Sequence, residues 1–435
     1  MDKSKKILKR LELLHPKKID LSLNRLEKLL KKLNNPQLKL PPTIHIAGTN
    51  GKGSVTSFLR SIFENAKLNV HTYTSPHLIR FNERIRINSK LVSNYDLSQL
   101  LEECEYFNNG EKITFFEITT AAAILAFSRI TSDFVLMETG LGGRFDATNV
   151  IKNKVCSVIT PISMDHMNFL GSSIRKIAIE KLGIFKKNTS SILSKQITSV
   201  RKLARVEAKK RNILLYEEGR DWKVGRKDSK KKKFNLSFQG SSYEFSFPSL
   251  NGEHQIDNAS TAIATSLSLK NSHISPKVIN KGLLNVEWPA RMQKLSDGKL
   301  AKIVGSKFEI WLDGGHNCHA SEMIKKVIQK WKSENIILIL GMTVGKQPTN
   351  FLRQIIDNVS AIILLPINDH HYIQPYEIKN DILLKLKAKI DIICKLDVEE
   401  ALVVTKKKFC SGKILVCGSL YLAGEVLKRD GFKIK

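Results

Sequence analysis

The residues most suited to chemistry are the glycines, lysine and serine of GTNGKGS, Gly48–Ser54. An apolar segment, TIHIA, precedes this motif, and a stretch with helical periodicity follows it. Glycines let backbone N–H groups close around phosphate oxygens, and a helix N-terminus adds positive potential. In this setting Lys52 would neutralise nucleotide phosphates, and the Ser54 hydroxyl would ligate Mg²⁺. The motif predicts a compressed phosphate-binding loop, with a plain glycine-rich turn as the alternative.

Three further motifs place polar residues where expected strands end. TSPHL, Thr74–Leu78, is a proline turn with a hydroxyl and an imidazole, and such a pattern alone is more typical of a turn than of a site. Glu138 ends an apolar strand and precedes a glycine cluster, which favours a Mg²⁺ ligand because a buried carboxylate is costly unless it binds a cation. Asp165 and His166 follow another strand. Taken alone, His166 and the helix lysine Lys181 are typical of ordinary structural residues.

Strands must position these groups, and short β-branched segments alternate with helical stretches along most of the chain. TIHIA, NVHTYT, DFVLMETG and CSVITPI are expected strands of a mainly parallel sheet, whose ligands gather at the carboxyl ends of the strands. Residues 213–247 alternate and are charged, which predicts an antiparallel excursion. A second series, FEIWLD, IILILG, AIILLP, DIICK and ILVCG, predicts a smaller α/β domain. We therefore expect a P-loop-type domain at 1–290 and a smaller Rossmann-like α/β domain at 291–435.

The bulk composition is that of a globular protein with more than one domain. The chain has 435 residues, of which 42% are hydrophobic. No apolar run reaches the roughly 18 residues of a membrane helix, and the N-terminal stretch resembles an amphipathic helix more than a signal peptide. Six scattered cysteines form no CxxC pair, which is typical of reduced thiols. We expect a cytoplasmic protein with no membrane partner.

The chain is strongly basic, with 71 Lys and Arg against 41 Asp and Glu and a net charge of +30. Such a field could attract nucleic acid or polyanionic substrates. However, the excess is spread along the chain, and its densest run, Lys230–Lys233, has no interleaved aromatic residues. These features favour a solvated surface over a nucleic-acid site. We expect no nucleic-acid partner, although an anionic substrate would benefit from the charge.

Taken in order, the motifs resemble those of folylpolyglutamate and dihydrofolate synthases, relatives of the ATP-dependent peptidoglycan amino-acid ligases. The resemblance runs from about Leu14 to Gly424. It rests on GTNGKGS, TSPHL, FFEITTAAA, ETGLGGRFDATN, Asp165–His166, EKLGIFK, GEHQIDNA, WPAR, DGGHN and GSLYLAGE. As an ordered set these motifs are specific, although each one alone is not.

The resemblance implies a site residue by residue. It implies that Asn50, Gly51, Lys52 and Gly53 hold the triphosphate of ATP, and that the nucleotide lies between the domains. Further ATP contacts would be Asn258, Arg291, Asp313 and His316. It implies two Mg²⁺ ions, ligated by Ser54, Ser75, Glu138 and His166. Lys181 matches a lysine that CO₂ converts to a carbamate. The pterin pocket would use Asp20, Leu21, Phe115, Phe116, Glu117, Phe145, Asp146 and Ala147.

Some positions depart from the family pattern. Ala290 stands where glycine is typical, Cys318 where proline is typical, and Leu182 where alanine is typical. The loop Gly341–Gln347 also lacks an acidic residue often found there. None of these changes removes an expected ligand, so they bear on domain closure or pocket shape.

The implied reaction is a ligation through an acyl phosphate, in which Lys52 and the metal ions offset the charge that gathers between carboxylate and phosphate. Its substrates would be ATP, L-glutamate and either dihydropteroate or a reduced folate, and the sequence leaves open which of the two, or both. It also leaves open the proton acceptor, with Asp165 and His166 as candidates. Two alternatives are a peptidoglycan-precursor ligase and a non-catalytic nucleotide-binding protein. We expect a monomer.

Overall fold

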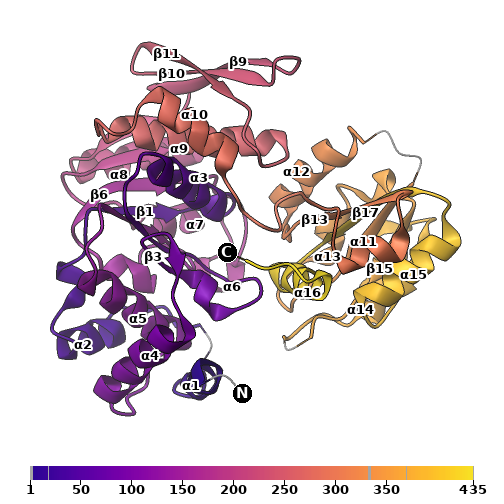
Figure 1. The fold of residues 1–435 in the computed structure, drawn as a ribbon, viewed down its shortest axis with the longest axis horizontal. Coiled ribbons are helices and arrows are strands. Elements are labelled where there is room, and N and C mark those ends of the chain that lie inside the picture. Colours follow the sequence, from indigo (N-terminus) through magenta and orange to yellow (C-terminus); the bar gives the residue numbers. More distant parts are fainter. Residues whose placement is uncertain (1–2, 18, 332–334, 369, 435) are drawn as a thin grey trace. The chain divides into compact units, whose positions relative to one another are not determined.

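The computed structural model describes residues 3–17, 19–331, 335–368 and 370–434, and it divides into two compact units (Figure 1). The first unit comprises residues 1–77, 81–249 and 256–287. The second comprises residues 78–80, 250–255 and 288–435. The predicted P-loop-type sheet lies in the first unit and the predicted smaller α/β sheet in the second, so the expected fold class is confirmed.

Within the described residues, eight strands form the large sheet of the first unit. These are β1 (Thr43–Ala47), β2 (Val70–Tyr73), β3 (Ile85–Ile87), β4 (Lys90–Leu91), β5 (Phe134–Glu138), β6 (Lys154–Ile159), β7 (Ser190–Leu193) and β8 (Leu214–Glu217). Their order is β4-β3-β2-β5-β1-β6-β7-β8. The strands from β2 to β8 in this order are parallel, whereas β3 and β4 add an antiparallel edge.

This strand order gathers the polar motifs at one edge. Strands β2, β5, β1 and β6 are consecutive neighbours, and the predicted site residues Ser75, Glu138, Lys52 and His166 follow or end them. The carboxyl ends of parallel strands meet at the same edge of a sheet. Four motifs that are far apart in sequence therefore share this edge.

Helices pack against the large sheet, whose central strands β1 and β5 are buried along their whole length. Those of the first part of the chain are α1 (Lys3–Leu11), α2 (Asn24–Lys32), α3 (Lys52–Asn65), α4 (Asn94–Asn108), α5 (Phe115–Arg129), α6 (Met167–Leu170), α7 (Ile174–Leu182), α8 (Thr198–Lys210), α9 (Glu253–Ser268) and α10 (Pro276–Asn285). One apolar core joins α1, α2, α4 and α5 to β2 and β5, and another joins α7 and α8 to β6 and β7. Thr114 begins α5 with a capping box that it forms with Glu117.

The antiparallel excursion begins later than the sequence predicts. Strand β8 pairs with β7 in parallel and belongs to the large sheet, so the expectation for residues 214–217 was wrong. The antiparallel sheet comprises β9 (Trp222–Asp228), β10 (Lys233–Phe238) and β11 (Ser241–Ser246), drawn above α10 in Figure 1. Strand β8 is the edge strand of the large sheet, and its last three residues are all buried, so its burial does not alternate.

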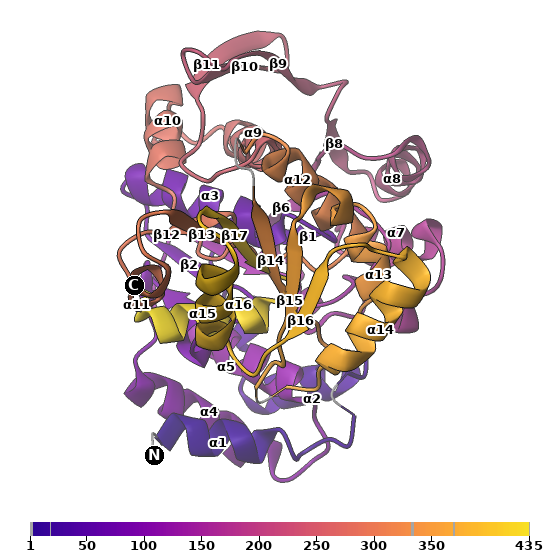
Figure 2. The same ribbon diagram turned by 90° about the vertical axis from the view of Figure 1, so that its right-hand side faces the viewer.

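The second unit is built on a six-stranded sheet among its described residues, with the order β12-β13-β17-β14-β15-β16 (Figure 2). The strands are β12 (Gln293–Leu295), β13 (Phe308–Leu312), β14 (Ile336–Leu340), β15 (Ala361–Leu364), β16 (Asp391–Cys394) and β17 (Gly412–Cys417). The five predicted apolar segments form β13 to β17, as expected. Strand β12, which lies where the pattern breaks, was not predicted, and it pairs antiparallel with β13.

Alternate residues of this sheet enter two separate cores. Ile337 and Ile339 of β14 pack with α11 (Lys299–Val304), α15 (Val398–Lys408) and α16 (Leu420–Asp430). Leu338 and Leu340 pack with α12 (Cys318–Ile328), α13 (Pro348–Leu352) and α14 (Pro375–Leu386). Burial on both faces explains why the strands are continuous apolar runs.

All six cysteines lie in the described part of the chain and are free thiols. In that same part, every helix is too short or too polar to span a lipid bilayer.

Candidate active site

The predicted phosphate loop connects β1 to α3, which begins at Lys52. Gly51 precedes the helix with a φ of 86°, in the region that favours glycine. A Cβ atom on Gly51 would lie 2.4 Å from the Asn258 side-chain oxygen, so only glycine fits beneath this amide. The Lys52 ammonium donates to the carbonyl oxygens of Gly48 at 3.3 Å and Thr49 at 3.4 Å. Asn258 and the loop residues therefore meet, as the resemblance implies.

The segment after β6 fixes the loop from one side. The Thr49 hydroxyl donates to the Ser163 carbonyl and accepts from the Ser163 N–H, both at 3.0 Å. The Thr49 N–H donates to the Pro161 carbonyl at 2.9 Å, and the Asn50 amide donates to the Ser163 hydroxyl at 3.3 Å. These contacts order the loop without using the N–H groups of Gly51 to Gly53.

Lys181, near the end of α7, is buried against the same loop. Its Nζ atom donates to the Gly48 carbonyl at 2.8 Å. Burial and, to a smaller extent, the Lys52 charge lower the pKa of Lys181 to about 7, although Asp165 and Asp146 act in the opposite direction. About half of these amines are then neutral at neutral pH, whereas almost every ordinary lysine is charged. A neutral amine is the form that can react with CO₂.

The predicted metal ligands suit magnesium. Glu138 ends β5 and is buried, and Ser54 is buried in the first turn of α3. Ser75 is half-buried after β2, and His166 is exposed at the start of α6. Across the described residues, no three His, Cys, Asp or Glu side chains group as a metal cage. A carboxylate with hydroxyls, completed by water and phosphate oxygens, is nevertheless the donor set that Mg²⁺ prefers.

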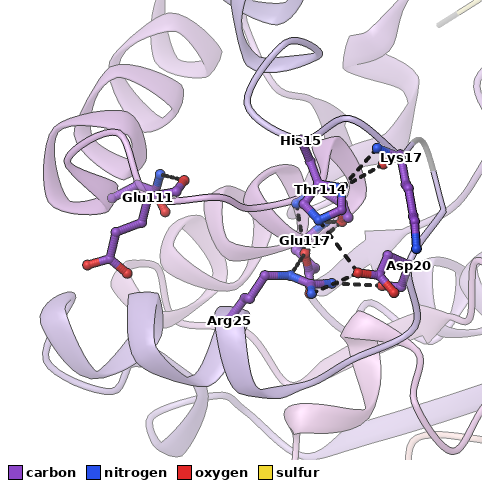
Figure 3. Close-up of polar contacts among 8 residues, drawn as sticks. His15, Lys17, Asp20, Arg25, Glu111, Thr114 and Glu117 are labelled. Atoms are coloured by element: carbon purple, nitrogen blue, oxygen red, sulfur yellow. Dashed lines mark hydrogen bonds and ion pairs between the residues drawn. The ribbon is translucent and has the colours of Figure 1, made fainter.

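The predicted pterin residues Asp20 and Glu117 are joined by Arg25, which the sequence reasoning missed (Figure 3). Arg25 donates through Nε to Glu117 Oε2 at 3.1 Å and through Nη1 to Asp20 Oδ2 at 3.0 Å. Its Nη2 also donates to the Asp20 carbonyl at 2.9 Å. Thr114 donates its N–H and its hydroxyl to the same Glu117 oxygen, both at 2.8 Å. Arg25 thus links the N-terminal segment, which includes the half-buried Leu21, to the start of α5.

Aromatic residues and glycines pack beside this group. A Cβ atom on Gly140 would lie 2.4 Å from the Phe116 ring, so the glycine cluster after Glu138 contacts the Phe-Phe-Glu segment closely. Phe115 lies edge-on to Phe81, with ring centroids 5.9 Å apart. A substrate held by these residues would lie near the end of β5.

The predicted loop of Phe145, Asp146 and Ala147 shows a division of roles. Phe145 is 40% exposed, whereas Asp146 and Ala147 are buried. Asp146 accepts from the Leu141 N–H at 2.8 Å and from the Thr148 N–H at 3.0 Å, so both of its oxygens order its own loop. Burial raises the pKa of Asp146, and these backbone hydrogen bonds oppose that shift.

Three predicted nucleotide contacts cluster within the second unit. Asp313 accepts from the Met292 N–H at 2.9 Å and from the Gly315 N–H at 2.7 Å, and His316 Nδ1 lies 2.9 Å from the Gly314 carbonyl. The Arg291 guanidinium lies beside Gly314, because a Cβ atom on Gly314 would be 2.7 Å from Arg291 Nη1. Ala290 has a φ of 57°, a conformation that favours glycine and accounts for the glycine typical of this position.

The structure brings several of the predicted residues together. Lys52, Lys181 and Asn258 meet at the phosphate loop, Asp20 and Glu117 meet through Arg25, and Arg291, Asp313 and His316 cluster in the second unit. Ser75, Glu138 and His166 end or follow neighbouring strands at one edge of the large sheet. Thr49 and Arg25 were missed. A lone threonine inside a glycine-rich loop carries no separate sequence signal. The one sequence signal for a role of Arg25 is the opposite charge of Asp20, five residues earlier.

Protein-family models match both units. One described as "Mur ligase middle domain" matches residues 46–266, which is half of the chain. Another, described as "Dihydrofolate synthetase, C-terminal domain", matches residues 296–429. The matched regions contain all of the predicted phosphate-loop and metal residues.

Whole proteins and solved structures agree with these models. The Saccharomyces cerevisiae dihydrofolate synthetase is 31% identical over 94% of this chain and 98% of its own. The structure of Escherichia coli FolC in complex with DHPP and ADP is 26% identical, with a TM-score of 0.86 over 98% and 97% of the two chains. A bifunctional folylpolyglutamate synthase/dihydrofolate synthase from Yersinia pestis, complexed with AMPPNP and Mn, is 25% identical, with a TM-score of 0.84 over 98% and 97%. The chain belongs to the dihydrofolate synthase and folylpolyglutamate synthase family, and its residues 46–266 form a Mur ligase middle domain.

Proposed function

We propose that this enzyme joins L-glutamate to the carboxylate of a pteridine-bearing acid, with ATP converted to ADP and phosphate. The observation that carries the proposal is the match to the yeast dihydrofolate synthetase, which extends over 94% of this chain and therefore includes both units. Dihydropteroate is the proposed acid, because the family model of the second unit is also that of a dihydrofolate synthetase. A reduced folate is a second candidate, because the Yersinia pestis relative is described as bifunctional.

In this proposal the phosphate loop binds the triphosphate of ATP. The N–H groups of Gly51, Lys52 and Gly53 point from the first turn of α3, where the helix dipole favours anions. The Lys52 ammonium now lies on two loop carbonyls, and the β- and γ-phosphates would draw it away from them. Asn50 and Asn258 flank the loop. Arg291, Asp313 and His316 are proposed as further nucleotide contacts from the second unit.

Ser54, Ser75, Glu138 and His166 are the proposed ligands of one or two Mg²⁺ ions. When bound, Mg²⁺ would offset the negative charge shared by the phosphates and the attacking carboxylate. Lys181 is proposed to be carboxylated, since the neutral amine can form a bond to CO₂ and lose a proton. The change would replace a buried cation with an anion close to Lys52, and it would supply oxygen donors for a cation.

The reaction then follows from charge and position. A carboxylate oxygen of the pteridine acid attacks the γ-phosphorus, and ADP leaves. Lys52 stabilises the charge that develops on the transferred group. The amine of glutamate next attacks the acyl phosphate carbon, and phosphate leaves as the amide forms. Asp165 and His166, which follow β6, are the proposed candidates for accepting the amine proton. We place the enzyme in the cytoplasm as a monomer.

The test is a product analysis. The purified chain is incubated with ATP, Mg²⁺, L-glutamate and either dihydropteroate or tetrahydrofolate, and the pteridine products are identified by mass. The proposal expects addition of one glutamyl residue to dihydropteroate, with equal amounts of ADP and phosphate. No glutamylation of either acid, with ADP released only on a nucleotide-linked peptidoglycan precursor, would refute it.

A further inference from the structure

A buried chain of polar groups connects the strand of the phosphate loop to the loop of Asp146. It begins at Lys154, the first residue of β6, whose side chain is 3% exposed. The Lys154 Nζ atom lies 2.5 Å from His45 Nδ1, in the middle of β1. It also donates to the Asn149 side-chain oxygen at 2.8 Å and to the Ile184 carbonyl at 3.2 Å.

The other end of the chain is the Asp146 carboxylate. His45 Nε2 lies 2.8 Å from the Thr148 hydroxyl oxygen, and that hydroxyl donates to Asp146 Oδ1. The three acceptors around Lys154 match the three protons of an ammonium group. His45 then accepts at Nδ1 and donates from Nε2, and Thr148 accepts from His45 and donates to Asp146. Each link therefore has one donor and one acceptor.

Burial makes this chain sensitive to the loss of any member. It lowers the pKa of Lys154 and of His45 well below their usual ranges, and it raises the pKa of Asp146. Burial thus disfavours the charged forms of Lys154 and Asp146, whereas the Asp146 charge acts in the opposite direction on the pKa of Lys154. A buried polar network with a missing member is costlier than a complete one, so the complete chain fixes the loop geometry.

Two sets of hydrogen bonds hold the loop of residues 144–149. Thr148 and Asp146 fix its middle, and the Asn149 amide donates to the Arg144 carbonyl at 2.9 Å. Lys154 contacts Asn149 directly and reaches Asp146 through His45 and Thr148. The residues between these anchors include Phe145 and Ala147, which the family resemblance assigns to the pocket for the pteridine acid.

We propose that Lys154 is a positioning residue that shapes the binding surface for the pteridine acid without touching it. The inference rests on the proposed function. It identifies a determinant outside every motif by which the family was recognised, since Lys154 lies in the segment between FDATN and SMDH. His45, Thr148 and Asn149 transmit its effect to the loop.

The test compares Lys154→Met with Ser157→Ala. The Ser157 hydroxyl lies on the same strand and donates to the same Ile184 carbonyl at 3.2 Å. Ser157 is the strand neighbour of His45 on β1, but its hydroxyl is not one of the links between Lys154 and Asp146. Lys154→Met is expected to raise the KM for dihydropteroate about tenfold and to change the KM for ATP less than about twofold. Ser157→Ala is expected to leave both constants unchanged.

A second variant keeps the inference testable if Lys154→Met fails to fold. Thr148→Val keeps the side-chain shape and breaks the chain at another link, so it should also raise the KM for dihydropteroate. Where both variants fold, the double variant should be no worse than the poorer single one, because both break the same chain. Equal rises in both KM values, or no change in either, would overturn the inference.

A substrate-free measurement separates this inference from the proposed function. Amide hydrogen exchange of residues 141–149 should be faster in Lys154→Met than in the wild type, and unchanged in Ser157→Ala. If the wild type glutamylates no pteridine acid, the proposed function fails. The exchange result still shows whether the hydrogen bonds of Lys154 hold the loop in place. Unchanged exchange in Lys154→Met would refute the positioning role by itself.

Discussion

The Lys181 amine donates to the Gly48 carbonyl at 2.8 Å, although 133 residues separate the two. This hydrogen bond joins the C-terminal turn of α7 to the start of the phosphate loop. It places a buried lysine with a lowered pKa beside Lys52, whose ammonium shares the same carbonyl at 3.3 Å. Two lysines with unlike environments therefore act at one loop, and we expect them to respond differently to substitution and to pH.

Replacing Lys52 should remove catalysis while preserving the fold. Lys52→Met loses the charge expected to stabilise the transferred phosphoryl group, so kcat should fall about 10³-fold. Lys67→Met, at an exposed lysine just beyond α3, is the matched control and should retain full activity. Steady-state release of ADP measures both variants. A Lys52→Met enzyme with wild-type kcat would contradict the role given to this residue.

Lys181 should make activity depend on dissolved CO₂. Because its pKa is about 7, the neutral amine is available to CO₂ at neutral pH. Activity should fall in CO₂-depleted buffer, return with bicarbonate, and be lost in Lys181→Met. Lys176→Met, at an exposed position on the same helix, should behave as the wild type. Full activity of the wild type after thorough CO₂ depletion would argue against carboxylation.

The same pKa predicts how stability changes with pH when CO₂ is absent. The amine of the unfolded chain binds a proton below about pH 10.5, and that of the folded chain only below about pH 7. The unfolded state therefore binds more protons between these values, so stability should rise with pH across this window. Lys181→Met should lack this rise. Urea unfolding at several pH values measures the difference between the two proteins.

Arg25 should affect the pteridine acid more than ATP. Arg25→Met removes hydrogen bonds to both Asp20 and Glu117, so the KM for dihydropteroate should increase about tenfold or more. Arg129→Met is the control, because Arg129 lies on α5 and pairs with the surface residue Glu103. Its KM values should match the wild type. An Arg25→Met enzyme that loses affinity only for ATP would contradict the assignment.

Metal removal should abolish activity reversibly. After treatment with EDTA and dialysis, added Mg²⁺ or Mn²⁺ should restore ADP formation in the wild type. Glu138→Gln keeps the shape of the side chain but removes the charge that would hold the ion, so much higher metal concentrations should be needed. Restoration at the same Mg²⁺ concentration in both proteins would exclude Glu138 as a ligand.

Much of the fold and part of the site could be predicted from local patterns. The apolar runs of β14 and β15 and the glycine loop before Lys52 are strong signals, because burial on two faces and phosphate binding each demand particular residues. The parallel pairing of β8 could not be predicted, since a four-residue strand derives its partner from tertiary packing. Arg25 and Lys154 were missed for a similar reason. Each is a single charged residue whose role depends on a partner distant in sequence. These partners are Glu117 for Arg25 and His45 for Lys154, and they meet only in the folded chain.

We propose that this enzyme activates a carboxylate by transferring to it the γ-phosphoryl group of ATP. The most direct test uses dihydropteroate labelled with a heavy oxygen isotope in its carboxylate. Transfer through an acyl phosphate predicts that each turnover moves one labelled oxygen from the carboxylate into the released phosphate. Phosphate without the label, formed in step with glutamylated product, would contradict the account.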